Sequence, residues 1–347
     1  MSISSRSRES RAPTQRRQAA RWQRERRRQR QVLAFAVVVF LLVIAIPTYG
    51  YYATFVAPPR QVVVSINGVD HTLGEVERLT SGNVAFFASV GREASLGVLP
   101  FEMINNLVVE ELVRQAASRM GLGVTQDEID AKIRETFYPT PPEGQQTDLE
   151  ALELEFRETL LQYFNITQWS ESYYREIVRN GILRERIRVL LSDQVPAVEE
   201  QVYAHWIVLT ENQLVEEVQA RIDEGDGFDR LARIYSVYDP YANDDGEVGW
   251  VPRGAFPDLD PVLFSLELDT ISEPISTSEN AIYFVKVTDG PEIREVSDEM
   301  REMLKNEAME QWIVEERAGS DISLRFGSSE YQWVVDKVRE KVLLSTS

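Results

Sequence analysis

Few side chains in this sequence could act as nucleophiles or bind a transition metal. The 347 residues include no cysteine and two histidines, His71 and His205. Without cysteine the chain can form no disulfide, thiolate metal site or thiolate nucleophile, and two histidines are too few for a His-rich metal centre. We expect no metal and no other cofactor. His71 follows a turn and is expected at the surface.

The charged residues are divided unevenly along the chain. Residues 1–31 hold eleven arginines and two glutamates, a net charge of +9, and the whole chain has a net charge of −19, so the rest must carry −28. We expect 1–31 to be a basic cytoplasmic tail; affinity for anionic lipid or nucleic acid is the alternative, and no nucleic-acid partner is expected. The acidic body is expected to be a soluble outer surface, with attraction of basic unfolded clients as the alternative.

An uncharged apolar segment lies between the basic tail and the acidic body. Val32–Val56 contains no charged residue, and a helix of that length extends about 37 Å, enough to span a bilayer. The arginine-rich flank should stay in the cytoplasm, which leaves the acidic body outside. We predict a transmembrane helix at 32–56, in a single-pass protein of the cell membrane with a cytoplasmic N-terminus. A cleaved signal peptide is the alternative.

Beyond this segment, most of the chain shows the periodicity of helices. A short strand at 61–66 ends at an Asn67-Gly68 turn, and Thr125 to Glu128 forms a capping box. Apolar residues near a 3.6-residue period predict helices. Their expected ranges are 73–87, 100–120, a helix after the capping box, 149–164, 168–192, one around 300–314 and a last one at 333–344.

Residues 201–289 contain an ordered series of blocks that differs from the helical flanks. The series is a strand at 201–209, an acidic helix at 225–236, Gly-Glu-Val-Gly-Trp-Val at 246–251, Ile-Ser-Glu-Pro-Ile at 271–275 and a strand at 282–287. This order resembles the parvulin family of peptidyl-prolyl cis/trans isomerases. The turn at Asp245–Trp250 is similar to the family's Gly-Gly-Asp-Leu-Gly-Trp turn.

The flanking segments resemble the SurA/PrsA class of extracytoplasmic foldases. The strand and turn at Val63–Gly68, the helix at 100–120, the segment 121–130 and Ser297–Ile322 carry this resemblance. It implies an α+β fold in which a parvulin-like domain, a four-stranded antiparallel sheet with helices at 197–290, is inserted into a helical SurA-like chaperone domain. That chaperone domain comprises 60–195 and is completed by 292–347.

Rotation about a prolyl bond needs no nucleophile and no metal. The barrier of about 18–20 kcal/mol comes from amide resonance, so a catalyst must bind the twisted amide better than the planar one. An apolar pocket for the proline ring and a few placed polar groups near the carbonyl can do this. Such a mechanism agrees with the lack of cysteine.

The resemblance also indicates catalytic residues, with departures from the family pattern. The two positions that are histidine in the family fall on Trp206 and Tyr283, and the acidic position falls on Asp239. His205 is one residue early, and one residue in a strand is a change of face, so it should not replace the family's histidine. Core packing of the two aromatics and a turn at Asp239-Pro240 are the alternatives.

The proline pocket of the family falls on Phe256, Leu259 and Phe264, which are therefore the expected substrate-binding residues. Packing of the two phenylalanines in a core is the alternative. The sequence thus predicts a peptidyl-prolyl cis/trans isomerase and foldase that acts on unfolded, proline-containing polypeptides outside the membrane. Because both histidine positions are replaced, the activity is expected to be weak. A chaperone of parvulin fold that only binds peptide is the alternative function.

Overall fold

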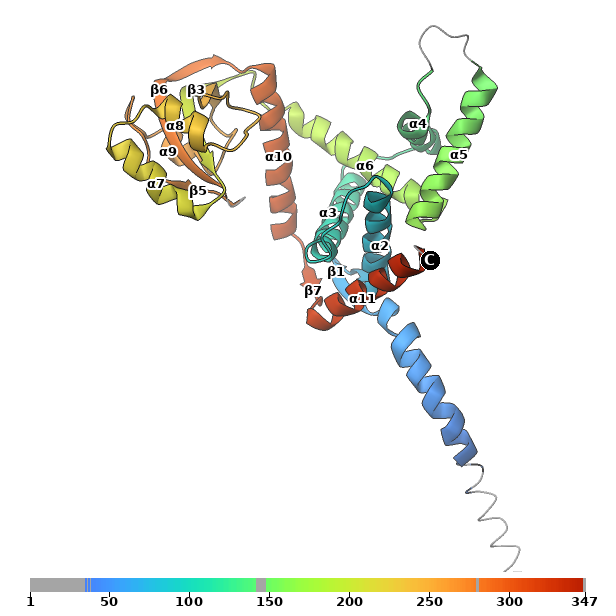
Figure 1. The fold of residues 1–347 in the computed structure, drawn as a ribbon. Coiled ribbons are helices and arrows are strands. Elements are labelled where there is room, and N and C mark those ends of the chain that lie inside the picture. Colours follow the sequence, from blue (N-terminus) through green and yellow to red (C-terminus); the bar gives the residue numbers. More distant parts are fainter. Residues whose placement is uncertain (1–34, 36, 38, 142–147, 279–280, 346–347) are drawn as a thin grey trace, which may run out of the picture.

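The computed structural model describes residues 35, 37, 39–141, 148–278 and 281–345 (Figure 1). An apolar helix leads into a helical unit, and a separate unit built on a sheet lies to one side of it. One helix in the described part of the chain, Val39–Val56, is long and apolar enough to cross a membrane, with a mean hydropathy of 1.7 and none of its residues buried. The basic tail and residues 32–34 of the predicted span lie outside the described residues.

The helical unit is assembled from segments that are far apart in the sequence. Strand β1 (Val62–Ile66) pairs with β2 (Val69–Thr72) in a hairpin and with β7 (Ile322–Leu324) on its other edge. The hairpin turns at Asn67-Gly68, as predicted, and both residues have positive φ. The strand order β2-β1-β7 therefore brings the N-terminal and C-terminal segments of the helical unit into one sheet.

Helices with the predicted apolar periodicity form the rest of this unit, and α2 and α3 contact the small sheet. They are α2 (Leu73–Ser89), α3 (Leu99–Arg119), α4 (Gln126–Phe137), α5 (Leu149–Thr167), α6 (Glu171–Ser192) and α11 (Ser328–Ser345). Thr125 and Glu128 form the predicted capping box at the start of α4. Val334 and Val338 of α11 are fully buried with Leu73 and Val76 of α2, so the C-terminal helix completes the core of this unit.

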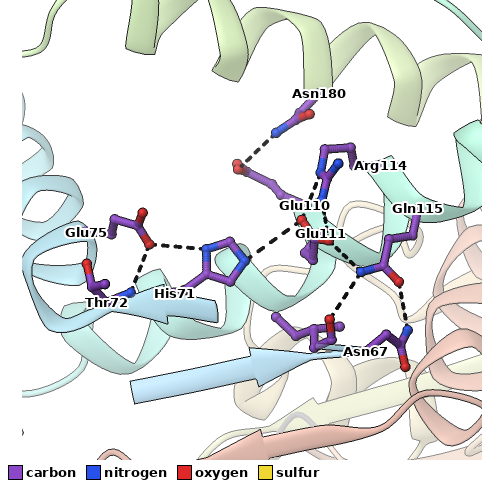
Figure 2. Close-up of polar contacts among 10 residues, drawn as sticks. Asn67, His71, Thr72, Glu75, Glu110, Glu111, Arg114, Gln115 and Asn180 are labelled. Carbon is purple, nitrogen blue, oxygen red and sulfur yellow. Dashed lines mark hydrogen bonds and ion pairs between the residues drawn. The ribbon is translucent and has the colours of Figure 1, made fainter. Parts of the chain in front are cut away.

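A polar network fixes the β1–β2 hairpin onto α3 (Figure 2). The His71 ring lies between two carboxylates, with Nδ1 3.2 Å from Glu75 Oε2 and Nε2 3.9 Å from Glu111 Oε2. The side chain of His71 is 16% exposed, and that of Glu111 4%. The expectation that His71 lies at the surface is therefore wrong, because α3 covers the hairpin.

The same network continues along α3. Gln115 Nε2 donates to the carbonyl oxygen of Ile66 at 3.2 Å, and Asn67 Nδ2 donates to Gln115 Oε1 at 2.7 Å. Glu110 accepts a hydrogen bond from Asn180 Nδ2 on α6 at 3.4 Å, and burial raises the pKa of its carboxyl group. These bonds satisfy polar groups at the junction of the hairpin, α3 and α6.

The sheet unit has the four-stranded antiparallel sheet expected from the sequence, in the order β4-β3-β6-β5. Its elements are β3 (Val198–Leu209), α7 (Asn212–Asp223), α8 (Phe228–Tyr235), β4 (Glu247–Pro252), α9 (Asp260–Leu263), β5 (Ile275–Ser276) and β6 (Ile282–Glu295). The sequence-predicted fold class, a helical unit with a four-stranded antiparallel α+β unit, is confirmed.

Alternation along the strands gives the sheet two apolar faces. The face named here the Phe284 face carries Ile207, Leu209, Ile282 and Phe284, and it is covered by α7 and α8. The opposite face, named the Trp206 face, carries Val202, Ala204, Trp206, Val208, Tyr283, Val285 and Val287. Phe256, Leu259 and α9 cover part of the Trp206 face.

Helix α10 (Asp298–Ala318) belongs to both units (Figure 1). In its N-terminal half, Met300 and Leu304 are buried in the core of the Trp206 face. In its C-terminal half, Trp312 and Ile313 are buried against α3 and α6. One helix therefore connects the two hydrophobic cores without an intervening linker.

Candidate functional site

The candidate site lies on the Trp206 face, where β3 and β6 run side by side. In the antiparallel register Trp206 pairs with Val285 and Val208 pairs with Tyr283. Residues two apart on a strand share a face, so the Trp206 and Tyr283 side chains project from the same side of the sheet. The two rings are 5.8 Å apart at 88°, an edge-to-face contact.

Trp206 is fully buried and fixes the position of Asp239. Its indole Nε1 donates a hydrogen bond to Asp239 Oδ2 at 2.8 Å, and the backbone N–H of Tyr241 donates to Asp239 Oδ1 at 2.8 Å. Hydrogen bonds to an ionised acceptor are stronger than neutral ones. The two donors therefore hold the Asp239 carboxylate in one orientation on the loop that follows α8.

The turn before β4 packs closely against the backbone of Trp206 at Gly246. Its φ is +77°, and a Cβ there would lie 2.6 Å from the carbonyl oxygen of Trp206. The backbone N–H of Trp206 donates to the carbonyl oxygen of Gly246 at 2.8 Å. Only glycine adopts this conformation in this space without strain, which explains the glycine in the turn before β4.

Aromatic rings surround a pocket next to this carboxylate. Phe256 contacts Trp206 at 5.0 Å and Tyr241 at 5.6 Å, both measured between ring centroids and both edge to face. The pocket has a volume of about 630 Å³, within the range of about 300–1,000 Å³ for small-ligand sites. Its lining includes Val208, Asp239, Tyr241, Phe256, Asp258, Leu259, Tyr283, Met303, Glu307 and Glu310.

Four of the six residues that the sequence suggested line this pocket. They are Asp239 and Tyr283 among the expected catalytic residues, and Phe256 and Leu259 among the expected substrate-binding residues. Trp206 lies directly behind the pocket wall rather than in the lining. Phe264 also lies outside the lining; the Arg253 guanidinium carbon lies 3.9 Å from its ring centroid.

His205 lies away from the pocket, as its position in the strand predicts. Its Nε2 is 3.4 Å from Thr288 Oγ1, and its ring contacts that of Tyr203. Burial lowers the pKa of His205, and the nearby Lys286 lowers it further, while Glu247 acts in the opposite direction. The ring is therefore held more strongly in its neutral form than a histidine in water.

The pocket rim is acidic. Asp258 accepts hydrogen bonds from the backbone N–H and the hydroxyl of Ser278 at 2.9 and 2.8 Å, and these lower the pKa of its carboxyl group. Burial raises the pKa of Glu307, a hydrogen bond with Gln311 acts in the opposite direction, and the neighbouring carboxylates of Glu310, Asp258 and Asp260 raise it further. Within the described part of the chain, no lysine, arginine or histidine lines the pocket.

Several lining residues were not expected from the sequence. Tyr241 follows Asp239 by two residues, and no motif in the sequence indicates it. Met303, Glu307 and Glu310 come from α10, whose apolar period predicts a helix but does not indicate what that helix contacts. The acidic positions at 307 and 310 are typical of any solvated helix face.

Comparisons with known proteins agree with this geometry. Residues 210–289 match the PPIC-type PPIase domain family, and residues 24–159 match the SurA-like N-terminal domain family. The chain carries a PPIC-type PPIase domain behind a SurA-like N-terminal domain. This confirms the resemblance to the parvulin family and to the SurA/PrsA class. The PPIC-type match contains the pocket lining except for Val208 on β3 and the α10 wall.

Proteins similar over longer stretches are named as foldases. Foldase protein PrsA of Geobacillus kaustophilus is 26% identical over 194 residues, which are 53% of this chain and 68% of that protein. Foldase protein PrsA of Oceanobacillus iheyensis is 25% identical over 247 residues, 62% of this chain and 80% of the relative. A solved structure of PrsA from Bacillus anthracis covers 69% of this chain and 97% of its own, at 14% identity and a TM-score of 0.37.

Proposed function

We propose that this protein is a membrane-anchored foldase that isomerises prolyl bonds in unfolded polypeptides outside the cytoplasm. The observation that carries the proposal is the apolar pocket with a fixed carboxylate and a phenol at its edge, inside a PPIC-type PPIase domain. The relatives named foldase protein PrsA support unfolded polypeptides as clients. The enzyme is a peptidyl-prolyl cis/trans isomerase.

The pocket suits the proline ring. Phe256 and Leu259 form an apolar surface within it, and Tyr241 packs edge-to-face against Phe256. Burial of apolar surface contributes about 25 cal/mol per Å², so the ring supplies binding energy that holds one side of the prolyl C–N bond in place. The rest of the peptide can then turn about the prolyl bond while the ring stays bound.

Asp239 and Tyr283 are placed to favour the twisted amide. A planar amide carries partial negative charge on its oxygen through resonance. A carboxylate near that oxygen disfavours this charge-separated form, and water exclusion by the apolar pocket strengthens the effect. The Tyr283 phenol can donate a hydrogen bond to the amide as well as accept one. Rotation then proceeds without a covalent intermediate.

Trp206 and Phe264 have different roles in this proposal. The buried Trp206 acts through Asp239, because its indole N–H fixes the carboxylate. It is a positioning residue rather than a group that touches the substrate. Phe264 packs beneath the Arg253 guanidinium and supports the loop next to the pocket.

The test is isomerisation of a proline tetrapeptide by the full chain. We expect a rate above the uncatalysed one and about a tenfold loss in Tyr283→Phe, because a net hydrogen bond contributes about 0.5–1.5 kcal/mol. The matched control is Tyr203→Phe, on the same strand pair but outside the pocket lining. An unchanged rate in Tyr283→Phe would remove the phenol from the mechanism.

A peptide-binding chaperone without isomerase activity is the second candidate. The observation that favours it is the replacement of both family histidine positions by Trp206 and Tyr283. An indole only donates, so the hydrogen bonds around the pocket differ from those of two imidazoles. Suppressed aggregation of an unfolded client with no gain in isomerisation rate would establish this function instead.

We also propose a single membrane crossing with the N-terminus in the cytoplasm. The apolar helix at Val39–Val56 and the eleven arginines that precede it support this orientation. Protease added to spheroplasts should digest the acidic body and leave the arginine-rich tail protected. Recovery of a mature chain that begins near Ala57 would instead show a cleaved signal peptide.

The domain division proposed from the sequence places 197–290 within a helical domain formed by 60–195 and 292–347. The pairing of β7 with β1 and the packing of α11 against α2 support the discontinuous helical domain. Deletion of 292–347 should therefore unfold the helical unit. Retention of its helical circular dichroism signal and melting transition in that deletion would contradict the division.

A further inference from the structure

The α10 helix forms one wall of the isomerase pocket although it lies outside the PPIC-type match at 210–289. Met303, Glu307 and Glu310 are spaced four and three residues apart, which places them on one face of the helix. All three line the pocket. Met300 and Leu304, buried in the core of the Trp206 face, hold this part of α10 against the sheet unit.

The α10 wall gives the pocket an uncompensated negative charge. It brings Glu307 and Glu310 to a cavity that already contains Asp239 and Asp258. Glu310 Oε1 lies 3.7 Å from Arg184 Nη2, but both side chains are more than half exposed, and such pairs contribute little. The described lining supplies no cationic side chain to balance the four carboxylates.

The pKa of Glu307 reflects the repulsion among these carboxylates. Burial and the carboxylates of Glu310, Asp258 and Asp260 raise its pKa, while a hydrogen bond with Gln311 acts in the opposite direction. A positive charge that entered the pocket would remove part of this repulsion, because opposite charges interact more strongly where water is partly excluded. The apolar Met303 lies next to these carboxylates and can contact the methylene stem of a long cationic side chain.

We propose that the α10 wall makes the pocket selective for prolyl bonds flanked by a lysine or arginine. The proline ring packs on Phe256 and Leu259, the stem of the neighbouring basic side chain packs on Met303, and its charged end lies near Glu307 and Glu310. The inference rests on the proposed isomerase function. It gives the substrate class of the site as basic unfolded segments, and it assigns the selection to a helix that also packs in the helical unit.

The test compares three tetrapeptides that differ only in the residue beside proline, which is lysine, alanine or glutamate. With the full chain at low salt, kcat/KM should be about tenfold higher for the lysine peptide than for the glutamate peptide. The ratio should fall as the salt concentration rises, because mobile ions screen partly exposed charges. Binding of labelled versions of the same peptides should follow the same order.

Variants distinguish the effect of the α10 wall on peptide preference from that of the protein's overall negative charge. The combination Glu307→Gln and Glu310→Gln should bring the lysine-to-glutamate ratio close to one, and the single change Glu310→Lys, at an exposed position, should lower it as well. Glu299→Gln is the matched control. Glu299 is an exposed acid on the same helix but outside the lining, so its loss should leave the ratio unchanged.

The outcomes for selectivity and for catalysis can be told apart. Equal kcat/KM and equal binding for the three peptides would overturn the selectivity while leaving isomerase activity in place. A preference that persists in the double variant, or that Glu299→Gln lowers equally, would also overturn it. Absence of turnover for every peptide would contradict the proposed isomerase function, and the order of peptide binding would then still decide the selectivity.

Discussion

The two faces of the four-stranded sheet are built in different ways. The Phe284 face is covered by α7 and α8, which lie between β3 and β4 in the sequence, and among the described residues its core draws only on the sheet unit. The Trp206 face needs Met300 and Leu304 of α10 to complete its core. The pocket opens on the second face, so the functional surface is the one whose wall is shared with the helical unit.

This comparison shows how one fold separates stability from function. A face that is closed by neighbouring helices can be packed to exclude water, and its residues contribute mainly to folding. A face that is closed only in part leaves an apolar hollow at the junction of two units, where ligand sites tend to form. The predictions below test that separation.

The largest expected contrast is between two phenylalanines on opposite faces. Phe284 is fully buried on the closed face, and Phe284→Ala should lower the free energy of unfolding by about 3–5 kcal/mol. Phe256 lines the pocket, and Phe256→Ala should lower isomerase kcat/KM about 100-fold with a smaller loss of stability. Denaturant unfolding and the tetrapeptide assay measure the two effects.

The contrast between these two variants also decides the role of Phe256. Equal losses of stability, with isomerisation unaffected by Phe256→Ala, would make Phe256 a core residue and remove the proposed pocket. A Phe256→Leu variant serves as a control, because it keeps an apolar side chain at the position and should retain more activity than alanine.

The next effect concerns the division of α10 between the two units. Leu304→Ala should lower the free energy of unfolding of the sheet unit by about 2–4 kcal/mol, because it leaves a cavity on the Trp206 face. Ile313→Ala, in the C-terminal half of the same helix, should affect the helical unit instead. Amide hydrogen exchange of β3 and α3 reports the two units separately. Identical exchange patterns in both variants would show that the sheet unit and the helical unit unfold together.

A smaller effect is expected where Trp206 fixes the Asp239 carboxylate. Trp206→Phe keeps an aromatic ring but removes the N–H that donates to Asp239, and it should destabilise the protein by about 1–3 kcal/mol. As a positioning residue, Trp206 should affect kcat more than KM. A loss of stability alone, with kcat unchanged, would make the indole a structural residue only.

The smallest effect is expected for His205, which lies away from the pocket. Because burial lowers its pKa in the folded state, the unfolded chain binds a proton more readily, and stability should fall as pH falls through about 6.5. His205→Ala should reduce this fall and leave tetrapeptide isomerisation unchanged. Urea unfolding at pH 5 and pH 8 measures the change in the free energy of unfolding. A large loss of activity in His205→Ala would place the ring in the mechanism.

Local pattern in the sequence was enough to predict much of the site. Strand alternation predicted that His205 faces away from Trp206, and its side chain does lie away from the pocket. The shared face of Trp206 and Tyr283 follows from the pairing of β3 with β6. The order of blocks predicted the family, and that resemblance indicated Asp239, Phe256 and Leu259, which line the pocket. Strand alternation could predict the side of His205 because it depends only on neighbouring residues, whereas the other positions came from the order of blocks along the chain.

What the sequence by itself determined was the class of chemistry, the membrane-length apolar segment and the order of the elements. The tertiary structure decided which surfaces meet. It placed the partly buried His71 between Glu75 and Glu111, placed Trp206 behind the pocket rather than in its lining, and brought the acids of α10 to the rim. Periodicity shows which side of a helix is apolar, but the partner that covers it lies tens of residues away in the chain, and only packing selects that partner.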